Sequence, residues 1–209
     1  MTRVVEVDHE RLPRWLAGFA DRHGETTVDG GSIAAADGTI ASLVSWAPIT
    51  ADSVETLLAA TAPPRRIGLL LVRRGGYAVA MSDSDETVVR KVGRRHVQSR
   101  TAAGGWSQQR FARRRGKQAD ELVGAVTEHA VRILGGATLD GLVRGGDRAL
   151  VAAVLADPRL RSLPGLPTRD LYDLPDPTST VLEIALRRAR SVRIGLSEAG
   201  PTSSAAGDL

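Results

Sequence analysis

Residues 67–92 read IGLLLVRRGGYAVAMSDSDETVVRKV and contain three short runs rich in apolar residues, separated by two polar turns. The runs are Ile67–Val72, Tyr77–Met81 and Thr87–Val92. This spacing predicts a three-stranded antiparallel meander. The first run is apolar throughout, so we expect it at the centre of a sheet, whereas the third run alternates and is expected near an edge.

A helix-rich second half follows the meander. Apolar residues recur at helical spacing from Ala119 to Leu134, and Gly135-Gly136 suits the end of a helix. A meander followed by helix, strand, helix, strand and helix (αβαβα) predicts an α/β (α+β) fold with an RNase H-like mixed sheet. The later strands are expected at Leu139–Val143 and Asp170–Leu174, and the later helices at about 147–156 and Thr178–Arg193.

The N-terminal sixty residues predict a helix and a small β extension. Leu12, Trp15, Leu16 and Phe19 share one helical face, so residues 9–22 are expected to form an amphipathic helix that ends at Gly24. Short strands are expected at Thr26–Val28, Ser32–Ala35 and Ile40–Trp46, with a helix at 52–61. We therefore expect residues 1–62 to pack on or form part of the main domain at 63–198, and residues 199–209 to be a disordered tail.

The composition excludes several classes of protein. The chain has 209 residues, 42% of them hydrophobic, which is enough for one ordinary domain or two small ones with a real core. It has no cysteine, which excludes disulfides, thiolate zinc sites and a cysteine nucleophile. No apolar stretch approaches the length of a membrane span, and acidic residues interrupt the N-terminus before a signal sequence could form. We expect a soluble, cytoplasmic protein with no membrane partner.

Basic residues are concentrated in one segment. Between Arg90 and Lys117 there are ten Lys or Arg residues and no Asp or Glu. The rest of the chain has 18 basic residues against 24 acidic ones, so it is acidic. This asymmetry favours a polyanionic partner at a defined place, although a solvated loop and an exposed helix face would also explain it.

Metal-dependent and serine-hydrolase chemistry have little support in the sequence. The four histidines are far apart and have no metal-ligand spacing, so we expect neither a metal nor a cofactor. Ser107 lacks a nucleophile-elbow motif. The first strand of the meander has no carboxylate for a two-metal nuclease, and Asp83, Asp85 and Asp147 are explained by turns and capping.

The basic segment contains the informative motif. Residues 100–115 read RTAAGGWSQQRFARRR. Gly104-Gly105 lies just ahead of a predicted helix, whose first N–H groups lack intrahelical partners and suit an anion or a developing oxyanion. Trp106 is either a stacking platform for a base or a hydrophobic anchor. Arg110, Arg113 and Arg114 fall on one helical face that can contact phosphates, and Phe111 falls on the opposite face.

This stretch resembles the Gly-Gly-Gln-Ser-x-x-Arg-Phe-x-Arg motif of eukaryotic and archaeal class I peptide-release factors. Residues 104–113 coincide with it at every specified position except that of the glutamine, which is Trp106 here. The departure is similar to the VLRF branch of release-factor-like proteins, in which the essential glutamine follows Gly and Ser. Gly105-Trp106-Ser107-Gln108 matches that pattern with one aromatic inserted. The length and element order also resemble stand-alone actinobacterial VLRF proteins.

The resemblance implies hydrolysis of the ester that joins a nascent peptide to tRNA, in the peptidyl transferase centre of the large ribosomal subunit. Gln108 is the implied essential glutamine and Gln109 its rival, with Gly104, Gly105 and Ser107 completing the catalytic loop. Ribosomal RNA and tRNA would supply much of the site. Because the chain lacks a separate codon-reading domain, the resemblance implies rescue of stalled ribosomes rather than ordinary termination. We expect the protein to be a monomer.

The basic residues around this loop are the expected contacts to ribosomal RNA or the tRNA acceptor end. Two alternatives remain open from the sequence: an endonuclease that cuts the tRNA acceptor end, and a non-enzymatic ribosome- or RNA-binding module. Arg94 and Arg95 are placed on the approach loop. The full set of expected RNA-binding residues is Arg94, Arg95, Arg100, Trp106, Arg110, Arg113, Arg114, Arg115 and Lys117.

Overall fold

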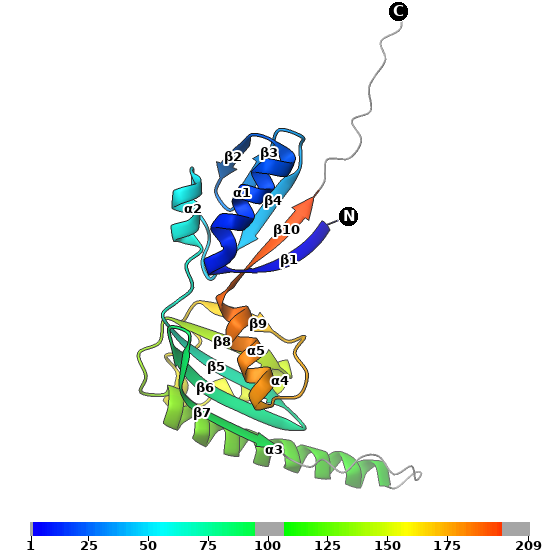
Figure 1. Ribbon diagram of the computed structural model, residues 1–209. Coiled ribbons are helices and arrows are strands. Elements are labelled where there is room, and N and C mark those ends of the chain that lie inside the picture. The colour runs from blue at the N-terminus through cyan, green and yellow to red at the C-terminus, as the bar shows by residue number, and fades with distance from the viewer. Residues whose placement is uncertain (1, 95–106, 198–209) are drawn as a thin grey trace, which may run out of the picture. The chain divides into compact units, whose positions relative to one another are not determined.

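The computed structural model describes the backbone of residues 2–94 and 107–197, and the side chains of residues 3–94 and 117–197. The chain divides into two compact units (Figure 1). The N-terminal unit comprises residues 1–63 together with 190–209, and the central unit is Pro64–Ala189. The predicted tail beyond Glu198 lies outside the described residues. None of the helices in the described part of the chain has the length and apolar character needed to cross a membrane.

The N-terminal unit is a five-stranded antiparallel sheet with helices against it. Its strand order is β1-β10-β4-β3-β2. Leu12, Leu16 and Phe19 of the first helix pack against the sheet residues Ile33 and Ile194, all at most 5% exposed. The predicted helices and strands of residues 9–61 are confirmed. The elements are β1 (Thr2–Asp8), a 3-10 turn (His9–Arg11), α1 (Leu12–His23), β2 (Thr26–Asp29), β3 (Ser32–Ala35), β4 (Ile40–Val44), α2 (Val54–Ala60) and β10 (Ser191–Ser197).

Two strands of this sheet differ from the sequence prediction. β1 was not predicted, and the helix expected to run to Arg193 ends at Arg190, where β10 begins. Val192 and Ile194 alternate with the exposed Arg193, which is the pattern of a strand with one buried face. Ile194 pairs with Val5 on β1 and with Leu43 on β4, so pairing with distant segments overrides the local helical pattern.

The central unit is a five-stranded mixed sheet, and the predicted α/β (α+β) class and element order are confirmed. Its strand order is β7-β6-β5-β8-β9, with the meander antiparallel and β5, β8 and β9 parallel. The first strand of the meander is central and the third lies at an edge, as expected. The elements are β5 (Arg66–Arg73), β6 (Gly76–Asp83), β7 (Glu86–Arg94), α3 (Ser107–Leu134), β8 (Gly141–Gly146), α4 (Arg148–Leu155), a 3-10 turn (Pro158–Leu160), β9 (Thr168–Leu171) and α5 (Ser179–Arg190).

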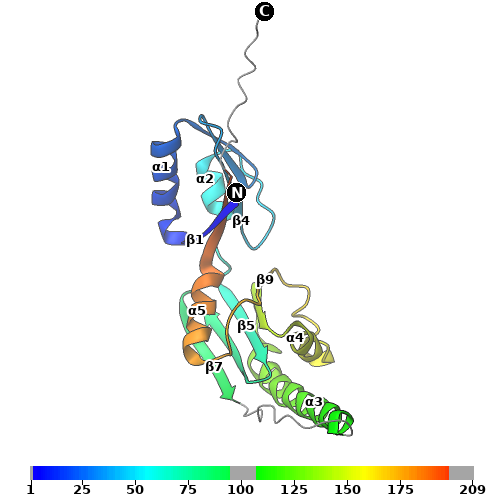
Figure 2. The same cartoon turned by 90° about the vertical axis from the view of Figure 1, so that its right-hand side faces the viewer.

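Helices cover both faces of the central sheet. α3 and α4 lie on one face and α5 on the other (Figure 2). The core beneath α3 joins Leu70 and Val79 of the meander to Val126, Ala130 and Leu134 of the helix, all 0% exposed. These helix residues belong to the C-terminal half of α3, and the first turns of α3 extend past the end of the sheet (Figure 1).

Candidate functional site at the end of the central sheet

The motif lies at the start of α3. The helix begins at Ser107, so Ser107, Gln108 and Gln109 are its first three residues, where backbone N–H groups lack intrahelical acceptors. This agrees with the prediction that the glycine pair stands just ahead of a helix. The structure describes only the backbone of the first turns of α3. The side chains that lie outside the described part include those of Ser107, Gln108, Gln109, Arg110, Phe111, Arg113, Arg114 and Arg115. The same holds for the whole of Arg95, Arg100, Gly104, Gly105 and Trp106.

Arg94 and Lys117 are the two expected RNA-binding residues with described side chains. Both are exposed. Lys117 is on α3, as predicted. Arg94 was expected on the approach loop, but it is the last residue of β7 and pairs with Gly76 of β6. The segment that carries Gly104-Gly105 therefore leaves the sheet at an edge strand and returns in α3.

The side of α3 that faces the meander is held by an aromatic contact as well as by the core. His129 stacks on Tyr77, with ring centres 5.5 Å apart. The Tyr77 ring in turn lies against Gly93, where a Cβ atom would collide with it. Burial of the imidazole, together with the positive charges of Arg132 and Lys91, lowers the pKa of His129. A neutral ring is therefore favoured at this contact.

Asp147 and Asp83, two acidic residues of the central unit that the sequence assigns to capping and turns, have structural partners. Asp147 caps α4 by accepting hydrogen bonds from the N–H groups of Ala149 (2.9 Å) and Leu150 (3.2 Å). Asp83 pairs with Arg65 at 2.9 Å and with Arg66 at 3.0 Å, and these hydrogen bonds lower the pKa of its carboxyl group. Within the described residues, no three metal-ligating side chains gather in one place. The described residues therefore do not provide the set of carboxylates that a two-metal nuclease uses to bind its metal ions.

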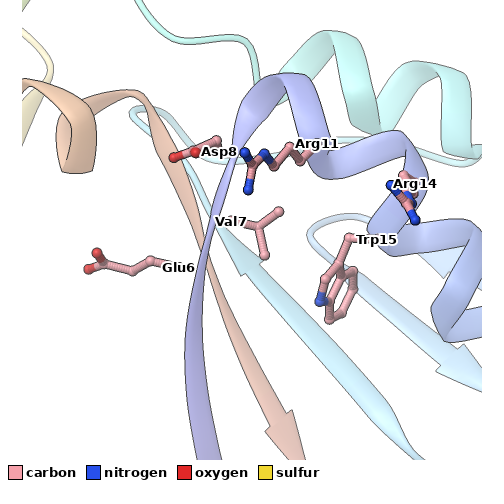
Figure 3. Close-up of a pocket in the computed structure, with 6 residues that line it drawn as sticks. All are labelled: Glu6, Val7, Asp8, Arg11, Arg14 and Trp15. Atoms are coloured by element: carbon pink, nitrogen blue, oxygen red, sulfur yellow. The ribbon is translucent and has the colours of Figure 1, made fainter.

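A shallow hollow of about 440 Å³ lies in the N-terminal unit, between β1 and α1 (Figure 3). Its lining is of mixed charge, with two carboxylates, two guanidinium groups and the indole of Trp15. Asp8 accepts a hydrogen bond from the hydroxyl of Ser191 at 2.9 Å, and Glu6 points away from Trp15 (Figure 3). Trp15 stacks on Phe19, with ring centres 5.6 Å apart, which agrees with its predicted role in packing. None of the predicted site residues lies in this hollow.

Sequence reasoning missed a group of residues beside Arg94. Arg73, Arg74, Arg148 and Tyr172 lie at the same end of the central sheet, because the parallel strands β5, β8 and β9 all finish there. From the sequence, Arg73 and Arg74 belong to the first polar turn of the meander, and their charge predicts no site there. These residues could have been found from the rule that ligands of α/β sheets bind at the carboxyl ends of the parallel strands, because each of them lies at or just after such an end.

A model of a known protein family covers most of the central unit and the start of β10. The family model for the Actinobacteria/chloroflexi VLRF1 release factor matches residues 65–195. The match starts at the beginning of β5, contains the whole Gly-Gly-x-Ser-Gln segment and ends within β10. No curated protein matches the chain. Because the family model matches more than half of the 209 residues, the chain belongs to the Actinobacteria/chloroflexi VLRF1 release factor family.

Proposed function

We propose that this protein hydrolyses the ester bond of peptidyl-tRNA on stalled ribosomes and so frees the nascent peptide. Membership in a release factor family indicates a ribosome-associated role in release or rescue. The observation that carries the finer proposal is Gly105-Trp106-Ser107-Gln108, a Gly and Ser followed by glutamine, at the entry to α3. A module that only binds RNA would need the arginines but has no use for this loop.

The proposed chemistry rests on a backbone donor and a placed water molecule. The N–H of Gln108 would stabilise negative charge on the tetrahedral intermediate or on the leaving 3′-oxygen of the ribose. Its side chain would position or admit the attacking water, and Gly104-Gly105 would let the backbone approach the ester closely. The chain needs no acid–base pair of its own, because ribosomal RNA and tRNA contribute the remaining groups. Gln109 is the rival for this role, since the inserted Trp106 shifts the spacing.

Binding would come from the basic segment. Arg94, Arg95 and Arg100 precede the loop, and Arg110, Arg113, Arg114, Arg115 and Lys117 follow it. Contacts of this kind to phosphates position a protein without reading sequence, which suits delivery of one loop into the peptidyl transferase centre of the large subunit. The central unit would carry out the reaction as part of a monomer in the cytoplasm.

The test is the chemical nature of the released peptide. The full chain is added to stalled ribosome–nascent-chain complexes, and the released peptide is analysed by mass spectrometry, with free peptidyl-tRNA as a parallel substrate. Hydrolysis gives a peptide with a free carboxyl terminus. A peptide that still carries nucleotides would overturn the proposal in favour of an endonuclease, and absence of release from both substrates would favour a binding module.

A further inference from the structure

The carboxyl end of the central sheet brings Arg73, Arg74 and Arg148, which lie outside the basic segment of residues 90–117, to the same end as Arg94, which lies inside it. Arg73 ends β5 and Arg94 ends β7, and both pair with Gly76 of the intervening strand β6. The two arginines therefore lie on the same face of the sheet, with two strand spacings, about 10 Å, between them. Arg74 follows Arg73 in the turn and is exposed. This end of the sheet is also where the chain leaves β7 toward Gly104-Gly105.

Arg73 reaches across the end of β8. A Cβ atom at Gly146 would lie 3.0 Å from Cγ of Arg73, so the arginine side chain passes close to this glycine. Its Nη2 atom donates a long hydrogen bond, 3.4 Å, to the carbonyl oxygen of Tyr172 just after β9. Its Nε atom is buried and has no hydrogen-bond partner in the part of the chain that the structure describes. Because this Nε is buried, the donors that the half-buried guanidinium group can offer a ligand are those of its terminal nitrogens.

Arg148 approaches the same tyrosine from the first turn of α4. Its guanidinium carbon lies 3.9 Å from the centre of the Tyr172 ring, a cation–π contact that orients the group. The side chain is 73% exposed, and the nearest carboxylate oxygen, on Asp170, is 3.9 Å away. That carboxylate already accepts hydrogen bonds from Arg144 at 2.8 and 3.1 Å. Arg148 therefore lies over Tyr172 while most of its side chain is exposed to solvent.

Three of the four carboxylates near this end of the sheet have structural partners, and Asp170 is shared between Arg144 and Arg148. Asp147 caps α4, Asp170 is held by Arg144, and Asp173 is held by Arg188 at 2.8 Å. The fourth, Asp176, lies close to Gly75, where a Cβ atom would be 2.6 Å from Oδ2, and it reduces the positive charge beside Arg74. We define the end cluster as Arg73, Arg74, Arg94 and Arg148 together with Tyr172.

We propose that the end cluster binds the phosphodiester backbone of RNA at the end of the sheet where the chain leaves β7. Guanidinium groups match phosphate oxygens in geometry and charge. The backbone positions of these arginines extend from β7 to β8, three strand spacings or about 14 Å, which exceeds the reach of one phosphate group and fits a chain of them. Arg94 lies on the face of the sheet that α5 covers, whereas Arg148 begins α4 on the other face, so the RNA would pass around the end of the sheet. The inference deepens the proposed function, on which it rests for naming that RNA as ribosomal RNA or tRNA.

The test compares two matched double variants of the full chain. Arg74→Ala with Arg148→Ala removes two exposed members of the cluster. Arg132→Ala with Arg161→Ala removes two exposed arginines, at the C-terminal end of α3 and after the 3-10 turn Pro158–Leu160, and changes the net charge equally. Affinity for a labelled single-stranded RNA of about 20 nucleotides is measured over a range of salt concentrations, with thermal unfolding as the check on folding.

The cluster variant is expected to bind this RNA about five- to tenfold more weakly, with a slope of log affinity against log salt that is shallower by about 1 to 2. The control variant should bind like the parent protein. Replacing the same two residues by lysine, which keeps the charge, should restore most of the affinity. Equal affinity in the parent and the cluster variant, or equal losses in the two double variants, would overturn the proposal.

Two further measurements separate this proposal from others. Inorganic phosphate at constant ionic strength is tested for stabilisation of the parent against heat. Stabilisation that disappears in the cluster variant, combined with unchanged RNA affinity, would assign the cluster to free phosphate and contradict the RNA proposal. Peptide release is assayed separately with the parent, so failure to release peptide would count against the proposed function and leave the RNA result standing.

Discussion

The ring of Tyr77 in β6 stacks on the imidazole of His129 in α3, with 5.5 Å between the ring centres and 20° between their planes. His129 lies about six helical turns after Ser107, where the motif enters the helix. The contact and the apolar core beneath the helix hold the C-terminal half of α3 on the sheet. Because the helix is continuous, this packed half sets the direction in which its first turns extend past the sheet. The aromatic pair thereby helps to position the motif.

This contact predicts a loss of stability in mild acid. The pKa of His129 is lowered below its ordinary value of 6.5 by burial and by the cations of Arg132 and Lys91, and Glu128 opposes them. The unfolded chain therefore binds the proton more readily than the folded chain does. The contribution is fully present above about pH 6.5 and is lost as the pH falls from there toward the folded pKa.

Urea unfolding between about pH 8 and about pH 5 measures this effect. A His129→Phe variant keeps an aromatic ring on Tyr77 but cannot titrate, so its unfolding free energy should fall less over this range than that of the parent. Identical pH profiles for the two proteins would show that His129 does not titrate differently in the folded and unfolded chains.

A pair of glycine substitutions tests the packing of α3 on the sheet. At Gly68 of β5, an added Cβ would lie 2.8 Å from Cδ1 of Leu139 and 3.3 Å from Cδ2 of Leu134. Gly68→Ala should therefore cost about 1 to 3 kcal/mol of unfolding free energy through overpacking. Gly124 of α3 is exposed with nothing within 4 Å of an added Cβ, so Gly124→Ala should stabilise by about 0.5 to 1 kcal/mol. Chemical denaturation of both variants tests this packing of α3. A change in unfolding free energy of the same sign in both variants would contradict it.

The basic start of α3 predicts a salt-dependent binding defect. Changing Arg113 and Arg114 to alanine removes two positive charges next to the loop, so ribosome binding should weaken about tenfold at low salt and depend less steeply on salt. Sedimentation with ribosomes over a range of salt concentrations measures this. The Arg132→Ala, Arg161→Ala variant, with the same net charge, should sediment like the parent protein. A defect shared by both variants would mean that net charge alone governs binding.

Most of the central fold could be predicted because each of its elements has a signal in its own stretch of sequence. The three runs of the meander are bounded by glycine, serine and aspartate, and the periodicity from Ala119 to Leu134 marks the packed half of α3. β1 and β10 could not be predicted in the same way. Val5 and Ile194 pair across almost the whole length of the chain, and nothing near either residue reveals its partner.

The same distinction between local and distant signals applies to the site. The motif from Gly104 to Gln108 is contiguous in sequence, so it could be found without a structure. Arg73, Arg148 and Tyr172 come from three separate strand ends, and only the parallel pairing of β5, β8 and β9 brings them together. Arg94 was found from its charge, but its place at the end of β7 required the register with Gly76.

The most direct test of the proposed hydrolase is peptide release by Gln108→Ala and Gln109→Ala variants. Each is added to stalled ribosome–nascent-chain complexes, with release and ribosome sedimentation measured side by side. Gln108→Ala should abolish release while sedimenting with ribosomes like the parent, and Gln109→Ala should retain release. Loss only in the Gln109 variant would transfer the role to its neighbour, whereas release by the Gln108→Ala variant at the parental rate would contradict the assignment of Gln108.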